Sequence, residues 1–390
     1  MITNLQFHPP PDHIVDLLVI AGEASGDEHS ALLMPGLLKQ NPSLKVSAIG
    51  GRGIEKEGVH LVYPLVDHAV VGLFEVLMNY STFKQIFINT IEWIKKYKPK
   101  TILLVDFPGF NLRLASELKK LGISSKGGGS VKILQYISPQ IWAWKPKRRF
   151  VMEKTLDGLG VIFPFEVACY KDTKLPVTFV GHPFAQSNYE CSIKYDSQGP
   201  LLLLPGSRVQ PVQRILPVFL DTLSKLLIDF PDLEVTLPFP DSRIRIVVEN
   251  LLSFRQDLKK KINLVEARNE ISASAALMSS GTMSLSCAIA GVPGVIAYRA
   301  HPLTYLLGRM LVKVPHLGMA NILLPLESPY PEFLQGKANG KLLHQSMVNI
   351  FNDNGIEEQS ASVAQKLIEC LKVSDERGVV EWLSQEISLA

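Results

Sequence analysis

An apolar run at residues 14–19 passes directly into the stretch Ile20-Ala21-Gly22-Glu23-Ala24-Ser25-Gly26-Asp27, and a segment with helical spacing follows it. This order predicts a buried strand, a tight glycine turn and a helix start. In open α/β sheets such turns lie at the carboxyl ends of parallel strands, where ligands bind. Ser25 and Asp27 are residue types that cap helix N-termini, where free N–H groups attract anions. We therefore expect an α/β fold with a ligand-binding turn here.

Two readings of this turn stay open. The glycine spacing is not the dinucleotide fingerprint G-x-G-x-x-G, so a nicotinamide or flavin site is not indicated. A plain strand-to-helix turn needs a glycine and a cap, but it does not need Glu23 beside them. The glutamate therefore favours a functional role over a purely structural one.

The order of strand, turn and helix then recurs along 390 residues, more than one hydrophobic core usually supports. A polar, turn-rich segment at residues 185–200 separates an earlier series of such units from a later one. We expect two Rossmann-like domains that face a central cleft, residues 1–190 and 198–365. Residues 366–390 are expected to form a C-terminal helical segment. Pro35-Gly36 should kink or divide the first helix.

The composition excludes several classes of protein. Apolar residues make up 46% and charged residues 20%, which is typical of a folded globular chain, and the net charge of +3 argues against a dedicated nucleic-acid binder. The four cysteines are scattered, which predicts neither a zinc site nor disulfides and fits a reducing cytoplasm. No secretory signal pattern or run of about 18 apolar residues is present, so we expect a soluble or peripheral protein.

The clearest candidate catalytic residue is Asp106, which follows the apolar strand 101–105 and precedes a Pro-Gly turn. An acid at the exit of a parallel strand is placed to act as a general base. The alternative is an aspartate that caps the helix expected at 112–121. A second glycine turn, residues 50–53, carries Arg52, which could contact an anion.

Two other segments of the first half suggest contact with lipid or an organic substrate. Residues 65–80 are strongly apolar and form either a buried helix or an exposed patch for acyl chains or a membrane, with Val70, Val71, Leu73 and Phe74 in it. Residues 138–149 combine Trp142 and Trp144 with Lys145, Lys147, Arg148 and Arg149. This segment fits the wall of a substrate pocket or an anchor for anionic lipid better than a nucleic-acid groove.

The second half contains two turns suited to phosphate. Pro205-Gly206-Ser207-Arg208 follows a four-leucine strand, and the Arg208 guanidinium matches phosphate oxygens at a helix entrance. Ser280-Gly281-Thr282 opens a helix of small residues and is either a second phosphate cradle or an ordinary cap. Asn321 could contact a ligand hydroxyl or merely cap a helix.

As an ordered set, the motifs resemble those of the lipid-A-disaccharide synthase family over residues 14–335. The set comprises Gly22-Glu23-Ala24-Ser25-Gly26-Asp27, Asp106-x-Pro-x-Phe-Asn111, Ser138-Pro-Gln-Ile-Trp-Ala-Trp144, Gly181-His-Pro183, Pro205-Gly-Ser-Arg208, Ser280-Gly-Thr282 and Asn321-Ile-Leu. The resemblance implies an inverting glycosyltransferase of GT-B type, which transfers sugar from UDP-2,3-diacylglucosamine to 2,3-diacylglucosamine 1-phosphate.

The resemblance also implies roles for individual residues. Asp106 matches the general base. Nucleotide-side matches are Arg208, Ser280, Gly281, Thr282 and Asn321, and matches on the acceptor lip of the cleft are Gly22, Glu23, Ser25 and Asn111. The family needs no metal or other cofactor, and this sequence has no Asp-x-Asp pair. The resemblance further suggests that the C-terminal segment 366–390 packs back on the first domain. It also suggests a homodimer that is cytoplasmic and peripheral on the inner face of the inner membrane, in contact with anionic lipid and not with nucleic acid.

Three positions in the donor half depart from the family pattern: Pro211 and Ser286 replace acids, and Ala320 replaces a frequent proline. These departures leave two alternatives open. One is another UDP-sugar enzyme of the same architecture, such as an epimerase. The other is a nucleotide-sugar or lipid-binding homologue with reduced or lost turnover.

Overall fold

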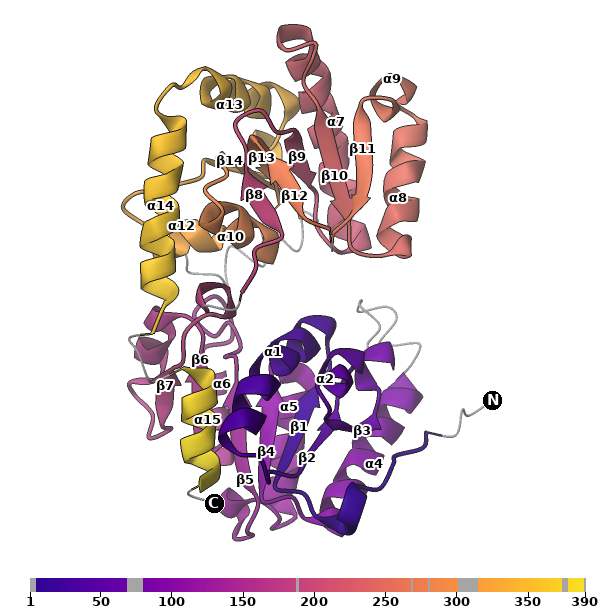
Figure 1. Cartoon of the computed structure of the whole chain (residues 1–390), viewed down its shortest axis with the longest axis vertical. Coiled ribbons are helices and arrows are strands. Elements are labelled where there is room, and N and C mark those ends of the chain that lie inside the picture. The colour runs from indigo at the N-terminus through magenta and orange to yellow at the C-terminus, as the bar shows by residue number, and fades with distance from the viewer. Residues whose placement is uncertain are drawn as a thin grey trace. The chain divides into compact units, whose positions relative to one another are not determined.

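The computed structural model describes residues 5–68, 80–186, 189–267, 269–279, 281–300, 315–373 and 378–388 (Figure 1). The chain divides into two compact units, Met1–Pro183 with Lys372–Ala390, and Phe184–Leu371. The expected acyl-chain patch and one turn residue lie outside the described residues: Val70, Val71, Leu73, Phe74 and Ser280.

The first unit is built on a parallel sheet with the strand order β3-β2-β1-β4-β5-β6-β7. Its strands are β1 (Leu17–Ala21), β2 (Val46–Ile49), β3 (His60–Tyr63), β4 (Thr101–Val105), β5 (Lys132–Tyr136), β6 (Gly158–Val161) and β7 (Val177–Phe179). Every residue of β1 and β4 is buried, which is why neither strand alternates between apolar and polar residues; Thr101 at the start of β4 is their one polar residue. The strand order reverses between β1 and β4, so a ligand-binding crevice is expected at their carboxyl ends.

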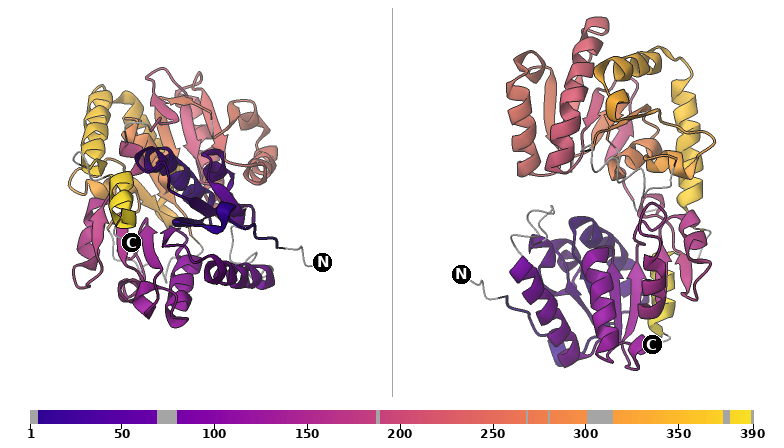
Figure 2. Two further views of the ribbon diagram at one scale, coloured as in Figure 1. Left: turned by 60° about the horizontal axis from the view of Figure 1, so that its bottom comes forward. Right: turned by 180° about the vertical axis from the view of Figure 1, so that it is seen from behind.

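Helices cover both faces of this sheet (Figures 1 and 2). One face carries α1 (Ala24–Gln40), α2 (Arg52–Lys56) and α15 (Val379–Ser388), and the other carries α4 (Tyr80–Tyr97), α5 (Pro108–Lys120) and α6 (Arg148–Thr155). Short 3-10 turns are η1 (Pro11–His13), η2 (Leu65–His68), η3 (Ser125–Gly127) and η4 (Pro164–Tyr170), with η5 (Pro183–Ala185) at the boundary between the units.

The C-terminal helix α15 packs on the first unit. Lys132 Nζ lies 2.8 Å from Glu386 Oε2, and Asn41 Nδ2 donates to Ser384 Oγ at 3.0 Å. A Cβ on Gly36 would lie 3.1 Å from Val380, so the missing side chain lets the two helices approach closely. The last residues of the chain are thus part of the first core.

We expected Pro35-Gly36 to kink or divide the first helix; the division is wrong, because α1 continues unbroken through Pro35. A proline inside a helix costs about 3 kcal/mol through its missing N–H and its ring clash. Leu33, Met34 and Leu37 beside it are almost fully buried, and each such side chain contributes about 1.5–3 kcal/mol. Burial of the surrounding face therefore outweighs the local penalty.

The second unit repeats the architecture with the strand order β11-β10-β9-β13-β14-β15. These strands are β9 (Leu201–Leu204), β10 (Val235–Phe239), β11 (Ile262–Glu266), β13 (Ala275–Met278), β14 (Gly294–Tyr298) and β15 (Glu332–Leu334), while β8 (Ile193–Tyr195) pairs with β12 (Ile271–Ala273). All pairs are parallel, and the order reverses between β9 and β13. The prediction of an α/β fold with two Rossmann-like domains is confirmed.

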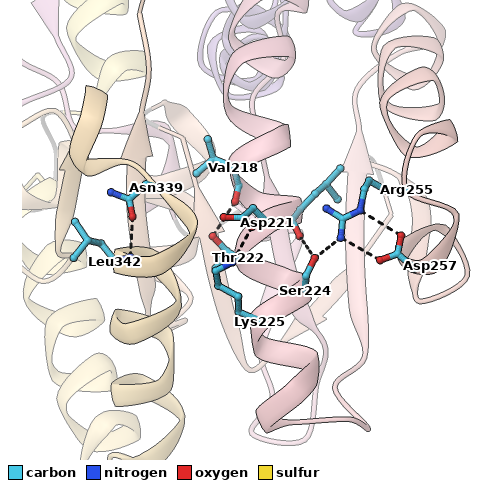
Figure 3. Close-up of polar contacts among 10 residues, drawn as sticks. Val218, Asp221, Thr222, Ser224, Lys225, Arg255, Asp257, Asn339 and Leu342 are labelled. Carbon is cyan, nitrogen blue, oxygen red and sulfur yellow. Dashed lines mark hydrogen bonds and ion pairs between the residues drawn. The ribbon is translucent and has the colours of Figure 1, made fainter.

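The helices of this unit are α7 (Val209–Asp229), α8 (Ser242–Ser253), α9 (Gln256–Lys259), α10 (Thr282–Ile289), α12 (Met319–Leu323), α13 (Gly340–Asn352) and α14 (Ile356–Leu371), with the 3-10 turn η6 (Gln335–Lys337). Figure 3 shows side chains of α7 and its neighbours. Arg255 bridges Ser224 on α7 to Asp257 on α9, and Asn339 caps α13 by accepting from Leu342 N at 3.1 Å. Gly340 has no side chain because a Cβ there would overlap the Asp221 carboxylate.

Candidate active site

The candidate base and the expected lip residues meet at the strand reversal of the first sheet. Ala21 and Val105, the last residues of β1 and β4, are paired in register, so Glu23 and Asp106 leave neighbouring strands at the same edge. The pKa of Asp106 is raised to about 6, mainly because the carboxyl group is buried, and the negative charge of Glu23 contributes to this shift. A carboxylate with this pKa is a stronger base than an ordinary aspartate.

The backbone at Asp106 is held in an unusual conformation. Asp106 and Phe107 have φ values of 44° and 48°, a left-handed region that costs a non-glycine residue roughly 1–3 kcal/mol. Asp106 N donates to Tyr136 O at 3.0 Å, and the Asp106 carbonyl accepts from Asn111 Nδ2 at 2.8 Å and from Gln135 Nε2 at 3.2 Å. These bonds hold the backbone of the turn that carries the carboxylate.

Asn111 is therefore a support of the turn. Its side chain is fully buried, and Nδ2 also donates to Val105 O at 3.2 Å. The alternative that Asp106 caps the next helix is wrong, because α5 begins at Pro108 and Phe107 holds the capping position. The Asp106 carboxylate is thus not required by the cap.

Gly22 allows an aromatic ring to cover the turn. A Cβ at this position would lie 2.0 Å from Cδ1 of Phe107. No other residue type fits beneath the ring, so this glycine links the end of β1 to the strained Asp106 turn.

The expectation that Ser25 and Asp27 cap α1 is wrong. Glu23 holds the capping position with extended backbone, and the exposed Ser25 lies inside the first turn. Asp27 is buried and accepts from Gly51 N at 2.9 Å, Gly53 N at 2.7 Å and Ile54 N at 3.3 Å. Its carboxylate caps α2 and occupies these N–H groups. Arg52, which we expected could contact an anion, has its guanidinium 2.8 Å from Glu55 Oε2.

The sequence reasoning missed Glu166 as a neighbour of the site. Glu166 is buried, Oε2 accepts from Phe163 N at 3.2 Å, and Oε1 accepts from Trp142 Nε1 at 3.2 Å. Burial is the largest cause that raises its pKa to about 8, and the charge of Asp106 adds to the shift. The available signal was an acid soon after β6, at the same edge of the sheet as Asp106.

Two histidines of this unit are held neutral by burial. Desolvation lowers the pKa of His29 to about 4 and that of His182 to about 3, and His29 adds to the shift of His182. With these lowered pKa values, both side chains are weaker bases than an ordinary histidine. His182 instead packs against Phe163, with ring centroids 5.1 Å apart.

The two phosphate-friendly turns of the second unit lie side by side at its strand reversal. Gly206 follows β9 with φ 115°, and a Cβ there would lie 3.2 Å from Ser279 Oγ, which follows β13. Arg208 is exposed at the start of α7 and forms no ion pair within the described parts of the chain. Gly281, with φ 153°, holds the capping position of α10, and Thr282 is exposed in its first turn.

Asn321 is placed differently from these residues. It is 1% exposed, Nδ2 donates to Tyr330 O at 2.7 Å and Glu332 Oε1 at 2.8 Å, and Oδ1 accepts from Tyr330 N at 3.0 Å. Glu332 also accepts from Leu317 N and Gly318 N, each at 2.9 Å. The Asn321 amide is thus committed to the loop that follows α12, a network that the sequence did not reveal.

Among the described residues, no group of three His, Cys, Asp or Glu side chains is arranged to hold a metal ion. Within the same residues, none of the helices is long and apolar enough to cross a membrane.

The fold defines the class of protein. A glycosyltransferase from Rickettsia africae has the same fold at 13% identity, with a TM-score of 0.54 and coverage of 96% of this chain and 97% of that one. UDP-GlcNAc 2-epimerase from Neisseria meningitidis, bound to UDP-GlcNAc, matches at 10% identity with a TM-score of 0.54, covering 96% and 98%. The chain therefore has the GT-B architecture.

The particular family follows from sequence. A family model described as lipid-A-disaccharide synthetase matches residues 17–386. Lipid-A-disaccharide synthase 1 of Legionella pneumophila (strain Lens) is 35% identical over 371 residues, covering 92% of this chain and 94% of the relative. Lipid-A-disaccharide synthase of Nitrosococcus oceani is 32% identical over 363 residues, covering 89% of each. The chain belongs to the lipid-A-disaccharide synthetase family, a family of glycosyltransferases, which confirms the resemblance seen in the sequence.

Proposed function

We propose that the chain transfers 2,3-diacylglucosamine from UDP to the 6-hydroxyl of 2,3-diacylglucosamine 1-phosphate. The products are a β-1,6-linked disaccharide 1-phosphate and UDP. Family membership supports the reaction class, and the observation that carries the mechanism is Asp106, a carboxylate of raised pKa held at the strand reversal. This position is where open α/β sheets bind their ligands.

Asp106 is the proposed general base. It takes the proton of the acceptor 6-hydroxyl while that oxygen bonds to the anomeric carbon on the face opposite UDP. The bond from the anomeric carbon to the phosphate oxygen breaks, and its electron pair leaves with UDP. Base catalysis of this kind supplies about 10²- to 10⁴-fold, so substrate positioning and stabilisation of the departing UDP must supply the rest.

The neighbouring turns of the second unit are the proposed nucleotide site. Arg208, Gly281 and Thr282 offer a guanidinium and first-turn N–H groups to the diphosphate. Ser280, which lies outside the described residues, remains a prediction for this site. Pro211 lies in the first turn of α7, where a proline is tolerated but supplies no N–H. The first turn therefore offers one donor fewer than a helix without the proline. In this proposal Asn321 does not contact the nucleotide but supports the site through its buried hydrogen bonds to Tyr330 and Glu332.

The Arg208→Ala variant is expected to bind UDP about tenfold to a hundredfold more weakly, because a charged donor to phosphate is lost. Titration calorimetry with UDP measures this directly. Arg214→Ala is the matched control, since Arg214 lies farther along α7 and its guanidinium donates to Gln210. An unaltered affinity in Arg208→Ala would remove this residue from the nucleotide site.

The Glu23→Gln variant should shift the pH dependence of kcat/KM. A base is active only when deprotonated, so wild-type activity should fall as the pH drops through about 6, the pKa of Asp106. Removal of the Glu23 charge lowers this pKa, so the fall should occur at lower pH. Glu28→Gln, an exposed acid on the same helix, is the control. An identical profile in Glu23→Gln would show that Glu23 does not act on the base.

The discriminating experiment for the function is incubation of the purified chain with both acylated substrates and mass detection of the disaccharide 1-phosphate. UDP binding without product would favour the binding homologue that Pro211 and Ser286 leave open. The epimerase alternative has only shared fold in its support, at 10% identity.

We further propose that the protein acts at the inner face of the cytoplasmic membrane in peripheral contact with anionic lipid, as a homodimer. The lipid-linked substrates implied by the family support membrane contact. Light scattering of the purified chain distinguishes a dimer from a monomer. The exposed acyl-chain patch at Val70, Val71, Leu73 and Phe74 remains a prediction.

A further inference from the structure

The surface of α6 carries an ordered stripe of apolar and basic side chains. Phe150 and Val151 are 38% and 44% exposed, and Lys147 and Lys154 are exposed on either side of them. These four residues have the spacing of one helix face. Met152, on the opposite face, is fully buried, and Thr155 at the end of the helix is 4% exposed.

Trp144 extends this stripe beyond the start of the helix. It is 40% exposed, and its ring lies beneath two cations, with Lys145 Nζ 4.4 Å and Arg148 Cζ 4.9 Å from the ring centroid. These contacts hold the indole at the N-terminal end of α6. We call Trp144, Lys147, Phe150, Val151 and Lys154 the α6 stripe.

The charges around the α6 stripe are strongly unbalanced. Residues 144–154 contain basic side chains at Lys145, Lys147, Arg148, Arg149 and Lys154, and a single acid, Glu153. Glu153 accepts from Lys174 N at 2.7 Å, and Arg149 pairs with Asp172. The other four cations form no ion pair with any described residue, so they are available to an anionic partner.

Other exposed apolar side chains lack this pattern. Phe254 and Ile246 of the second unit are 83% and 56% exposed, yet their surroundings include the ion pairs of Arg255 with Asp257 and of Arg245 with Glu249. Single exposed apolar residues are normal on a protein surface. Aromatic rings between unpaired lysines are instead typical of helices that lie in a membrane interface.

We propose that the α6 stripe binds the surface of an anionic lipid bilayer. Trp144, Phe150 and Val151 enter the boundary between headgroups and acyl chains, while the lysines contact lipid phosphates. This is a contact surface separate in sequence from the apolar segment 65–80. The biological role of this contact rests on the proposed function, because the lipid-linked substrates of that reaction lie in a bilayer.

The position of the stripe connects it to the candidate base. The loop that bears Trp142 and Trp144 follows β5, whose Gln135 donates to the Asp106 carbonyl. The same loop is fixed by the hydrogen bond from Trp142 to Glu166. A bilayer bound at the N-terminal end of α6 would therefore lie beside the edge of the sheet that carries Asp106.

Flotation with vesicles of phosphatidylglycerol and phosphatidylethanolamine tests the proposal on the full chain. Lys147→Gln/Lys154→Gln is expected to weaken binding about thirtyfold, from the loss of two cations near an anionic surface, and Phe150→Ser/Val151→Ser about tenfold. Vesicles of phosphatidylcholine alone should bind the wild type weakly. Ile246→Ser/Phe254→Ser is the matched control and should float like the wild type.

Tryptophan fluorescence gives an independent test of the geometry. Trp93 and Trp382 are 5% and 6% exposed, and Trp142 is half-buried against Glu166, so brominated lipid should quench mainly Trp144, and Trp144→Phe should lose most of the quenching. Equal flotation of wild type and both stripe variants would overturn the proposal. Loss of vesicle binding only in a polar variant of Val71, Leu73 and Phe74 would also overturn it. So would stripe variants that lose binding to RNA but keep binding to vesicles.

Activity separates this inference from the proposed function. The Phe150→Ser/Val151→Ser variant should convert substrates dispersed in detergent micelles at the wild-type rate, because these two residues lie outside the segment 138–149 that fits a pocket wall. Lipid binding through the stripe without disaccharide formation would refute the proposed function and leave the surface assignment standing. Loss of micellar turnover in a folded stripe variant would instead contradict its role as a bilayer contact alone.

Discussion

The Asp106→Asn variant is expected to lower kcat by about 10²- to 10⁴-fold while UDP affinity changes little. Asparagine keeps the size of the side chain, and the turn is held through its backbone by Asn111 and Gln135. The variant therefore removes the proton acceptor without removing its support. Steady-state kinetics with both acylated substrates, together with UDP calorimetry, give the two quantities.

Asp172→Asn is a suitable control for this variant, since Asp172 is an exposed acid of the same unit that pairs with Arg149. It should leave kcat unchanged. A normal rate in Asp106→Asn would eliminate Asp106 as the base. A parallel loss of UDP affinity would instead indicate that the carboxylate acts in binding.

The Asp27→Ala variant is expected to destabilise the first unit by about 3–5 kcal/mol. The buried carboxylate accepts three backbone N–H groups around the start of α2, and its removal leaves them unsatisfied. All four tryptophans, Trp93, Trp142, Trp144 and Trp382, belong to the first unit, so their fluorescence in urea follows that unit selectively.

Asp241→Ala is the matched control for this experiment. Asp241 also caps a helix, accepting from Arg243 N at 2.8 Å and Ile244 N at 3.0 Å, but it lies in the second unit. It should leave the tryptophan transition in place. An unshifted transition in Asp27→Ala would mean that the carboxylate is not needed to hold α2.

Part of the candidate site was predictable because its residues follow buried strands. Asp106 and Glu23 come directly after apolar runs, and parallel strands bring their carboxyl ends to one edge. Arg208 and Gly281 were found by the same reasoning in the second sheet. Ser25 and Asp27 were misassigned because both are good capping residues, and sequence does not show which helix a carboxylate reaches.

The supporting residues were not predictable. Gln135 acts through a contact with the Asp106 turn, a segment distant in sequence. Glu332 contacts the nearby residue Asn321, but nothing in the sequence distinguishes it from an ordinary strand residue. The uninterrupted α1 was missed for a related reason. A proline penalty is local and visible in the sequence, whereas the burial of Leu33 and Leu37 that offsets it depends on the assembled core.

The sequence by itself determined the strand-turn-helix order, the two Rossmann-like domains, the family and the positions of the acid and the phosphate-friendly turns. These follow from local apolar patterns and short motifs, which depend on neighbouring residues. The tertiary structure decided the raised pKa of Asp106, the strained turn that aims it and the exposed stripe on α6. Burial, charge proximity and exposure are set by groups that the chain brings together from far apart, so only the folded protein decides them.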